Sequence, residues 1–438
     1  MSEINHAVKG TNDILPADSF KWQFVEQKML ETARLFGFRE IRVPVFEHTE
    51  VFHRSVGDTT DVVQKEMYTF DDKGGRSITL RPELTAGTVR SVIENGLVYG
   101  ALPVKVCYIG GCYRYEKPQA GRLREFHQFG VECFGAASSV ADAEVIALAK
   151  QVLNNIGIKK ISLEINSIGC PECRKEYHKA LKAYFASKTD ELCETCRDRL
   201  ERNPMRILDC KSPVCSAIAA DAPVVLDYLC DDCHEHFEQT KAHLDAAGID
   251  YSVNPHIVRG LDYYTRTVFE FVSGDIGAQS TVCGGGRYDG LVAQMGGNPV
   301  PALGFAMGIE RLMMVLENQG FEFPEEAKCD LYIAAMGNNA ALKATALCRS
   351  LRDAGLEAQT DICGRGLKAQ MKYADKTGAK FTLVLGDNEL ESGKAIMKNM
   401  ADGTQTEVEL DTLADTLCTL EAQLALDSLT DAVAKDIK

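Results

Sequence analysis

A polar hairpin is the first part of the chain whose residue types could do chemistry. Residues 112–132 (CYRYEKPQAGRLREFHQFGVE) are typical of a strand, a basic loop and a second strand. Because side chains alternate along a strand, Phe126, Gln128 and Glu132 should share one face. An ordinary surface hairpin is the alternative, but such hairpins rarely gather an aromatic ring, an amide and a carboxyl on one face. This face is therefore a candidate binding site.

Two further segments carry arginines in unusual places. In RGLDYYTRTVFEF (259–271), Arg259 precedes two adjacent tyrosines and the start of a strand, although alone it could simply form a surface salt bridge. In ALGFAMGIERLM (302–313), a strand leads through Gly308 into a helix that bears Arg311. An arginine at a helix start opposes the positive end of the helix dipole, so another interaction should hold it there. A polyphosphate would supply that interaction.

A glycine-rich segment, CGGGRYDGL (283–291), lies between these two. Its glycines permit positive φ angles and a close approach of the backbone to a ligand. It lacks the context of a dinucleotide-binding fingerprint and the lysine of a Walker loop. A tight β-turn is the alternative interpretation.

Eight of the sixteen cysteines lie between positions 170 and 233. Three C-x-x-C pairs and one wider pair make up the set: Cys170/Cys173, Cys193/Cys196, Cys230/Cys233 and Cys210/Cys215. The first two C-x-x-C pairs are separated by nineteen residues, which is within the range of a zinc ribbon or finger, so the spacing predicts structural zinc. The eight cysteines could serve two four-cysteine sites, or one site with four spare thiols. Catalytic zinc is not expected, because four thiolates leave no open coordination position. Cysteines packed as small hydrophobic residues are the alternative.

The elements that must position these residues follow from periodicity. Residues 18–36 predict a helix that ends at Gly37, and 41–47 predict a strand in which Pro44 favours an edge or interface position. Residues 140–156 predict a helix, and 161–166 a strand. The alternation of strands and helices after residue 330 is typical of a small α/β domain.

These patterns divide the chain into domains. A discontinuous core comprises 1–167 and 254–325, a helical Cys-rich domain is inserted at 168–253, and an α/β domain spans 328–425, followed by a tail at 426–438. A length of 438 residues fits several domains, and 45% hydrophobic residues suffice for their cores.

Composition limits the setting of the protein. The net charge of −15 argues against nonspecific coating of nucleic acid but allows a local basic site. The first residues have neither a signal-peptide nor a transit-peptide pattern, and no stretch is as apolar as a membrane span. Sixteen cysteines in such a chain indicate thiols or metal ligands. A reducing cytoplasmic location is therefore expected.

Taken together, the segments resemble the class II aminoacyl-tRNA synthetases over nearly the whole chain. FGFREIRVP resembles motif 1, YRYE…REFHQFG motif 2, and GFAMGIERL motif 3. RGLDYYTRTVFE and GGGRYDGL are similar to the two signatures peculiar to histidyl-tRNA synthetases, and GRGLKAQMKYADKTGAKF is similar to their anticodon-binding domain. The resemblance implies an α+β catalytic domain with a mostly antiparallel sheet, an inserted helical Cys-rich domain and a C-terminal α/β anticodon-binding domain. It gives no support to zinc, because the familiar insert needs no metal.

The resemblance also implies an activity, histidine–tRNA ligation through a histidyl-adenylate, with ATP and Mg²⁺. It implies that Arg114 holds the α-phosphate and the histidine carboxylate, that Arg311 clamps the far phosphates, and that Phe126 stacks on adenine. Arg259 becomes the main transition-state stabiliser. The residues implied to bind histidine are Glu83, Thr85, Gln128, Glu132, Tyr263 and Tyr264. At position 84 this chain has Leu where the family often has Gly, which should alter the pocket only slightly.

The macromolecular partners implied are tRNA(His) and a second copy of the chain, joined through motif 1 as a homodimer. Candidate tRNA contacts lie in the motif 2 loop and in the last domain, where a solvated charged surface is the alternative. They are Lys117, Gln119, Arg122, Arg124, Arg365, Lys368 and Lys372.

Several protein classes share part of this pattern. A regulatory subunit of histidine biosynthesis has the same fold, but it usually lacks the last domain and degrades the RGLDYYT signature, both of which this chain keeps. Class II synthetases for threonine, proline or glycine share motifs 1 to 3 without RGLDYYTRTVFE and Glu132. A sensing domain fused to a kinase is excluded, because no kinase segment is present.

Overall fold

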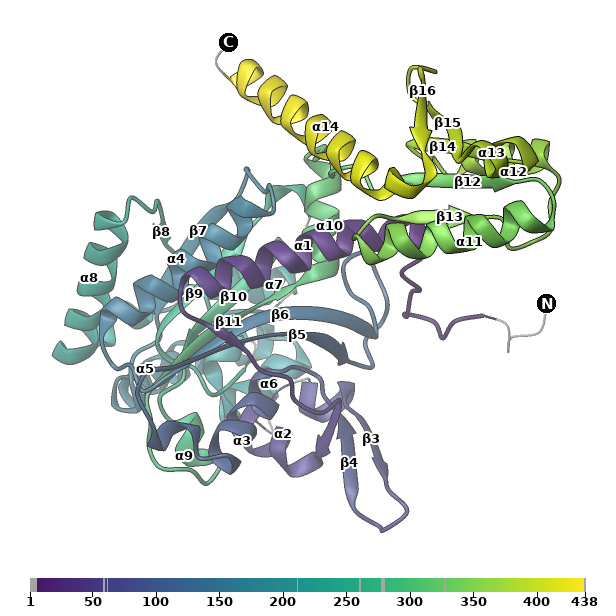
Figure 1. Ribbon diagram of the computed structural model, residues 1–438. Coiled ribbons are helices and arrows are strands. Elements are labelled where there is room, and N and C mark those ends of the chain that lie inside the picture. Colours follow the sequence, from purple (N-terminus) through teal and green to yellow (C-terminus); the bar gives the residue numbers. More distant parts are fainter. Residues whose placement is uncertain are drawn as a thin grey trace. The chain divides into compact units, whose positions relative to one another are not determined.

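The computed structural model describes residues 6–436 except 58–59, 61, 211, 260, 277–279 and 327 (Figure 1). The ends of the predicted core and tail, 1–5 and 437–438, thus lie outside the described residues. The chain forms two compact units, Met1–Phe323 and Pro324–Lys438, which are described separately. Among the described residues, no helix combines the length and hydropathy needed to span a membrane.

An eight-stranded sheet, in the order β1-β5-β6-β11-β10-β9-β7-β8, dominates the first unit. Its edge pairs β1/β5 and β7/β8 are parallel and the other pairs are antiparallel, which confirms the predicted mostly antiparallel sheet. The strands are β1 (Arg39–Glu40), β5 (Val104–Tyr113), β6 (Glu125–Phe134), β7 (Ser162–Ser167), β8 (Ser252–Val253), β9 (Thr265–Val272), β10 (Thr281–Arg287) and β11 (Ala302–Gly308).

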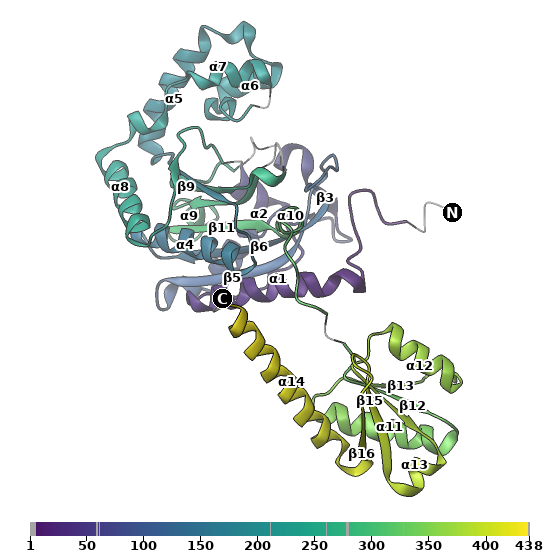
Figure 2. The same cartoon turned by 90° about the horizontal axis from the view of Figure 1, so that it is seen from above.

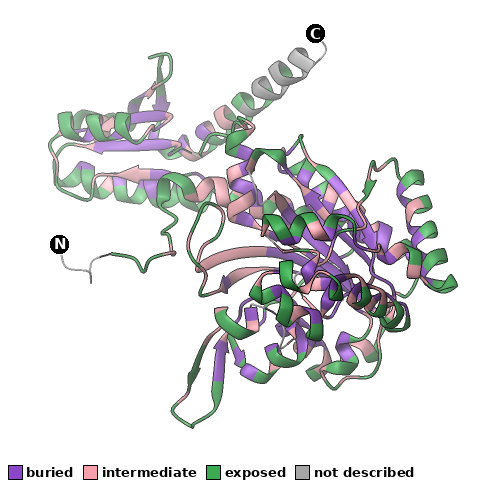
Figure 3. Ribbon diagram, turned by 180° about the vertical axis from the view of Figure 1, so that it is seen from behind, coloured by how far each residue is buried: buried purple, intermediate pink, exposed green. Residues whose placement is uncertain are grey.

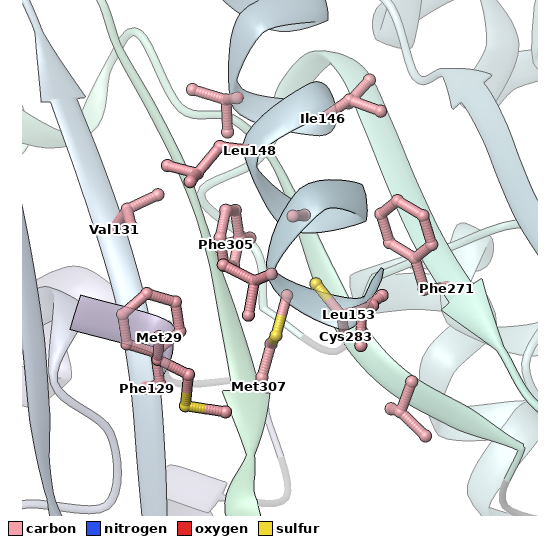
Figure 4. Close-up of a cluster of buried hydrophobic side chains, with 14 of the residues drawn as sticks. Met29, Phe129, Val131, Ile146, Leu148, Leu153, Phe271, Cys283, Phe305 and Met307 are labelled. Carbon is pink, nitrogen blue, oxygen red and sulfur yellow. The ribbon is translucent and has the colours of Figure 1, made fainter. Parts of the chain in front are cut away.

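The main core lies where α1 (Pro16–Leu35) and α4 (Ser139–Asn155) cover this sheet (Figure 1). Figure 4 shows Met29 of α1 and Leu148 of α4 gathered with Phe129 and Val131 of β6. Odd-numbered residues of β6 thus enter the core, and its even-numbered residues face the other way. Figure 3 shows the buried residues concentrated along the strands.

A smaller sheet, β2-β4-β3, lies before the hairpin in sequence. The strand predicted over 41–47 is wrong in extent, because β1 ends at Glu40 and β2 begins at Phe46. Pro44 has no N–H to donate and restricts the residue before it, which accounts for the break. The elements here are β2 (Phe46–His48), α2 (Thr49–Val56), the π-helix η2 (Val62–Glu66), β3 (Tyr68–Asp71), β4 (Ser77–Leu80), α3 (Thr85–Glu94) and η3 (Leu97–Tyr99), with α9 (Leu291–Gln294) and α10 (Ile309–Asn318) later in the unit.

The Cys-rich segment between β7 and β8 is helical, as predicted, and Figure 2 shows α5, α6 and α7 grouped at one end of the unit. Its last helix, α8, packs against α4 and contributes Phe237 and Leu244 to the main core. The elements are α5 (Pro171–Ala186), η4 (Thr189–Glu191), α6 (Glu194–Arg202), η5 (Pro204–Ile207), α7 (Pro213–Ala220), η6 (Val225–Tyr228) and α8 (Asp231–Ala246), with η7 (Gly274–Ile276) after β9.

The second unit is the predicted α/β domain, with strand order β13-β12-β14-β15-β16. Leu331 and Ile333 of β12 pack with α11 on one face, whereas Tyr332 and Ala334 pack with α12 on the other. Its helix α14 (Leu413–Asp436) runs through residues 426–436, where a tail was expected. The remaining elements are β12 (Leu331–Ala335), α11 (Asn338–Asp353), β13 (Ala358–Thr360), α12 (Leu367–Lys376), β14 (Phe381–Leu385), α13 (Asp387–Ser392), β15 (Lys394–Asn399), β16 (Gln405–Glu409) and η8 (Leu410–Thr412).

Candidate active site

A cavity of about 260 Å³ lies in the first unit, bounded by β6, β10, β11 and the segments before α3 and β9. All ten residues expected to bind histidine or ATP line it, although they come from five separate stretches of the sequence. They are Glu83, Thr85, Arg114, Phe126, Gln128, Glu132, Arg259, Tyr263, Tyr264 and Arg311.

Glu132 is the buried acid of the cavity and is only 1% exposed. Tyr108 donates to one carboxyl oxygen at 2.8 Å, and Tyr288 donates to the other. Gly304 pairs with Glu132 across the sheet, and a Cβ at Gly304 would collide with the carboxyl. Only glycine fits beside this side chain.

Burial raises the pKa of Glu132 to about 8, against the opposing effect of the Tyr288 and Tyr108 hydroxyl groups. The carboxyl therefore gains or loses a proton near neutral pH. It can accept a hydrogen bond from a ligand N–H, and in its protonated form it can also donate one.

A second acid, Glu83, stands at the start of α3. Its two oxygens accept hydrogen bonds from the backbone amides of Thr85 and Ala86, each at 2.7 Å, and burial raises its pKa. We call the two acids Glu83 and Glu132, together with Tyr263 and Tyr264, the carboxyl set. All four side chains are buried and polar. The Tyr263 and Tyr264 rings lie 4.7 Å apart.

Four arginines also line the cavity, together with the acids Glu116 and Glu310, and we call Arg114, Arg122, Arg259 and Arg311 the arginine set. Arg114 donates through Nε to the Pro82 carbonyl at 2.8 Å, and its guanidinium lies 5.1 Å from the centre of the Phe126 ring. An aromatic face beside a fixed cation suits a ligand that is planar at one part and anionic at another.

Arg259 is held by Glu270, whose other oxygen accepts a hydrogen bond from Thr281 at 2.6 Å. Burial alone would lower the pKa of Arg259, but the Glu270 carboxylate and the Tyr264 hydroxyl together outweigh burial and raise it. The Nε atom of Arg259 is buried and has no hydrogen-bond partner among the described residues. A fixed, permanently charged donor with spare capacity is suited to an anionic ligand.

Arg311 lies in the first turn of α10, as predicted. It donates to the backbone carbonyls of Gly121 at 3.0 Å and Thr281 at 2.8 Å. Burial lowers its pKa, and the like charges of Arg122 and Arg114 lower it further. Four guanidinium groups around one cavity repel one another, and a polyphosphate would relieve that repulsion.

Sequence reasoning missed the residues that support this lining. Tyr108 and Tyr288 hold Glu132, and Glu270 holds Arg259. Behind Tyr288, the fully buried Arg287 is paired with Asp142. The apolar run from Val268 to Val272 in β9 could have pointed to Glu270, the charged residue within it, but no local signal links Tyr108 to Glu132.

The candidate tRNA contacts are divided between the motif 2 loop of the first unit and the second unit. In the motif 2 loop, Lys117 and Gln119 are exposed, Arg122 borders the cavity, and Arg124 lies 4.2 Å from the centre of the Tyr115 ring. In the second unit, Lys368 and Lys372 are exposed on α12. Arg365 is instead half-buried, 4.3 Å from the centre of the Tyr373 ring and 3.4 Å from Asp361.

The eight cysteines of the insert gather into two groups of four. Within each group the sulfur atoms all lie within 4.8 Å of one another. One group is Cys170, Cys173, Cys230 and Cys233, and the other is Cys193, Cys196, Cys210 and Cys215.

Comparison with known proteins agrees with this geometry. Residues 10–312 match the family described as histidyl-tRNA synthetase, and residues 330–420 match the anticodon binding domain. The histidine–tRNA ligase of Acetivibrio thermocellus is 58% identical, covering 94% of this chain and 99% of its own, and that of Caldanaerobacter subterraneus subsp. tengcongensis is 55% identical, covering 93% and 98%. The crystal structure of apo S. aureus histidyl-tRNA synthetase matches with a TM-score of 0.81 and 41% identity, covering 94% of this chain and 99% of that one.

These matches confirm the fold class and the activity expected from the sequence. They span both units, and the relatives are covered almost completely. The chain therefore belongs to the histidyl-tRNA synthetase family, class II, and its activity is that of an ATP-dependent histidine–tRNA ligase.

Proposed function

We propose that histidine is activated in the cavity, where the carboxyl set recognises histidine and where Arg114, Arg259 and Arg311 of the arginine set hold ATP. The histidine carboxylate attacks the α-phosphorus of ATP, the bond to the β-phosphate breaks, and pyrophosphate leaves. The 3′ hydroxyl of tRNA(His) then attacks the histidyl carbonyl and AMP leaves. The barrier of the first step comes largely from bringing two anions together.

One observation carries this proposal: Arg114, Arg259 and Arg311 line the same cavity as the buried Glu132. Arg114 would hold the histidine carboxylate against the α-phosphate, with adenine on Phe126. Arg311 would hold the far phosphates. Arg259, fixed by Glu270 and with a buried N–H unpaired among the described residues, would stabilise the charge that develops at the α-phosphate. ATP enters as its Mg²⁺ complex, which is the substrate.

Histidine selection rests on the imidazole, which in its neutral form has one donor and one acceptor. Glu132 would accept from one ring nitrogen and Tyr264 would donate to the other, while Glu83, Thr85, Gln128 and Tyr263 surround the α-amino group. An amino acid that lacks a matching ring leaves these buried groups unpaired. Sites of this kind reject such analogues by large factors, so proofreading is unnecessary.

The test is ATP–pyrophosphate exchange on the purified protein with each of the twenty amino acids. Exchange with histidine alone would support the proposed activity. Exchange that is nearly abolished in Arg259→Ala but retained in Lys372→Ala, which alters an exposed residue, would support the role given to Arg259. Full exchange in Arg259→Ala would contradict the role given to Arg259.

The partners are part of the same proposal. The motif 2 loop residues Lys117, Gln119, Arg122 and Arg124 would meet the acceptor end of tRNA(His), and Arg365, Lys368 and Lys372 the anticodon arm. A homodimer through residues 36–47 is supported by the exposure of Val45 (41%) and Phe46 (58%). Light scattering on Phe46→Asp, compared with the unaltered chain, would test the dimer.

The proposal also covers the cellular location of the protein and a metal in the insert. A reducing cytoplasm is supported by sixteen cysteines that all remain free thiols. A structural zinc in the insert is supported by the two four-cysteine groups.

A further inference from the structure

The two cysteine groups have the geometry of closed metal sites. Zinc bound by four thiolates at about 2.3 Å in a tetrahedron places the sulfurs about 3.8 Å apart. The Sγ atoms of Cys170 and Cys173 are 3.6 Å apart, and those of Cys193 and Cys210 are 3.9 Å apart. We call Cys170, Cys173, Cys230 and Cys233 the first cluster, and Cys193, Cys196, Cys210 and Cys215 the second.

The backbone around both clusters is arranged so that it can stabilise negatively charged sulfur atoms. Cys170, Cys193 and Cys230 are the N-cap residues of α5, α6 and α8, so the second cysteine of each C-x-x-C lies in the first helical turn. Helix N-termini stabilise negative charge, and thiolates in particular. The N–H of Cys230 donates to Cys173 Sγ at 3.1 Å, and the N–H of Cys193 donates to Cys215 Sγ at 3.2 Å.

Disulfide bonds, an iron–sulfur cluster and simple hydrophobic packing each fit the two clusters less well than zinc does. All eight cysteines are free thiols, and separations of 3.6 and 3.9 Å are far beyond a disulfide bond. A four-iron cluster would place its own atoms between the thiolates and hold them further apart. Simple hydrophobic packing would bury the thiols, whereas Cys230 is exposed and Cys170, Cys193 and Cys210 are only half-buried.

The first cluster is joined to the segment that carries the two cavity tyrosines. Arg174, next to Cys173, donates to the Tyr264 carbonyl at 3.0 Å. Gly169, next to Cys170, accepts from the Arg266 N–H at 2.9 Å. Arg266 has a φ of 51°, a conformation that costs free energy unless its surroundings hold it. Gly169 itself has a φ of 65°, and a Cβ there would lie 2.5 Å from Cys173 Cβ.

The second cluster reaches the same segment from its other end. Cys210 donates its N–H to the Ile207 carbonyl, at the end of η5. From η5 and the residue before it, Arg206 and Asn203 each donate to Asp262 at 3.2 Å. Residues 262–266 are thus contacted on both sides of Tyr263 and Tyr264. The segments that make these contacts are adjacent in sequence to the two cysteine clusters.

We propose that the insert binds two structural zinc ions, one in each four-cysteine cluster, and that together they position Tyr263 and Tyr264 in the cavity. Both sites are closed, so neither ion takes part in the chemistry. Arg174 and Arg206 are positioning residues, because they contact the tyrosine-bearing segment and not the substrate. The zinc content can be measured without any assumption about the catalytic roles, whereas the effect on histidine binding rests on the proposed function.

The first experiment measures metal on the unaltered full-length chain, purified without chelator and denatured before elemental analysis. Two zinc ions per chain support the proposal. One ion or none overturns the two-site assignment, and iron in place of zinc overturns the metal. Cys173→Ser and Cys196→Ser should each retain one ion, and Cys418→Ser, which alters an exposed thiol of α14, should retain two.

The second experiment separates positioning from folding by leaving the cysteines intact. Arg174→Met should keep two zinc ions and raise the KM for histidine roughly tenfold, with the KM for ATP little changed and partial recovery in Arg174→Lys. Arg206→Met should act in the same direction. An unchanged histidine KM in both variants overturns the positioning role while leaving the metal sites standing. Loss of histidine dependence altogether in the unaltered chain would instead count against the proposed function.

Discussion

The carboxyl set and the arginine set of the cavity differ in how their polar groups are satisfied. Glu132 and Glu83 are buried, and the protein itself supplies their hydrogen bonds, from tyrosine hydroxyls and from backbone amides. Arg259 is fixed by one carboxylate yet keeps a buried N–H without a partner in the described part of the chain. The first arrangement is rigid before any ligand arrives, which suits selection. The second arrangement keeps a hydrogen-bond donor without a partner. Such a donor can stabilise negative charge that develops only during the reaction.

The largest effect is expected from Arg259. Replacing it by Ala should lower kcat for ATP–pyrophosphate exchange by about 100- to 1000-fold, because one preorganised donor at the developing charge is removed. Steady-state exchange with histidine measures this change. Glu270→Gln is the matched variant and should lose less, since the arginine remains but is less firmly held. A rise in KM with no fall in kcat in Arg259→Ala would contradict the role assigned to Arg259.

A smaller effect, on recognition, is expected from Glu132. Glu132→Gln keeps the side-chain volume but removes the carboxylate that would accept the imidazole N–H, so the KM for histidine should rise by about ten- to a hundredfold. The ATP dependence of exchange in the same variant is the control and should change little. A variant with unaltered histidine KM would remove Glu132 from the recognition site.

Arg311 should give the next effect. Arg311→Ala should raise the KM for ATP by about tenfold through loss of one charge-assisted contact to the far phosphates. Its histidine KM should stay close to the starting value. The opposite pattern, with histidine affected and ATP not, would mean that the arginine set does not bind the nucleotide.

The last expected effect is on stability rather than on kinetics, and it comes from the pKa of Glu132. A carboxyl whose pKa rises from 4.5 to about 8 on folding binds its proton more tightly in the folded state. Its contribution to stability is therefore complete below pH 4.5 and is lost as the pH rises through about 8. In the absence of ligand, the melting temperature should fall more between about pH 5 and pH 8 in the unaltered chain than in Glu132→Gln, as calorimetry would show. Parallel profiles would mean that the carboxyl ionises freely.

Much of this arrangement could be predicted from the sequence because it is local. Alternation along β6 put Phe126, Gln128 and Glu132 on one face, and the first turn of α10 marked Arg311 by its conflict with the helix dipole. Two groups of four were one of the alternatives, but their members could not be predicted, because spacing joined Cys170/Cys173 to Cys193/Cys196 and the structure joins them to Cys230/Cys233.

The remaining misses have the same origin. Tyr108 reaches Glu132 only because the register of β5 and β6 sets Tyr108 opposite Gly130, two residues before Glu132, and Tyr288 reaches Glu132 from the far side of β11. The strand predicted over 41–47 failed where Pro44 outweighed the apolar alternation. The contacts of Tyr108 and Tyr288 depend on strand pairing between distant parts of the sequence, whereas the break at Pro44 is a local effect that the alternation hid.

The different roles of the two sets can be tested by full kinetics of ATP–pyrophosphate exchange for Arg259→Ala and Glu132→Gln, measured side by side. We expect Arg259→Ala to lose mainly kcat, and Glu132→Gln to lose mainly affinity for histidine. The same pattern of loss in both variants would contradict this difference in roles.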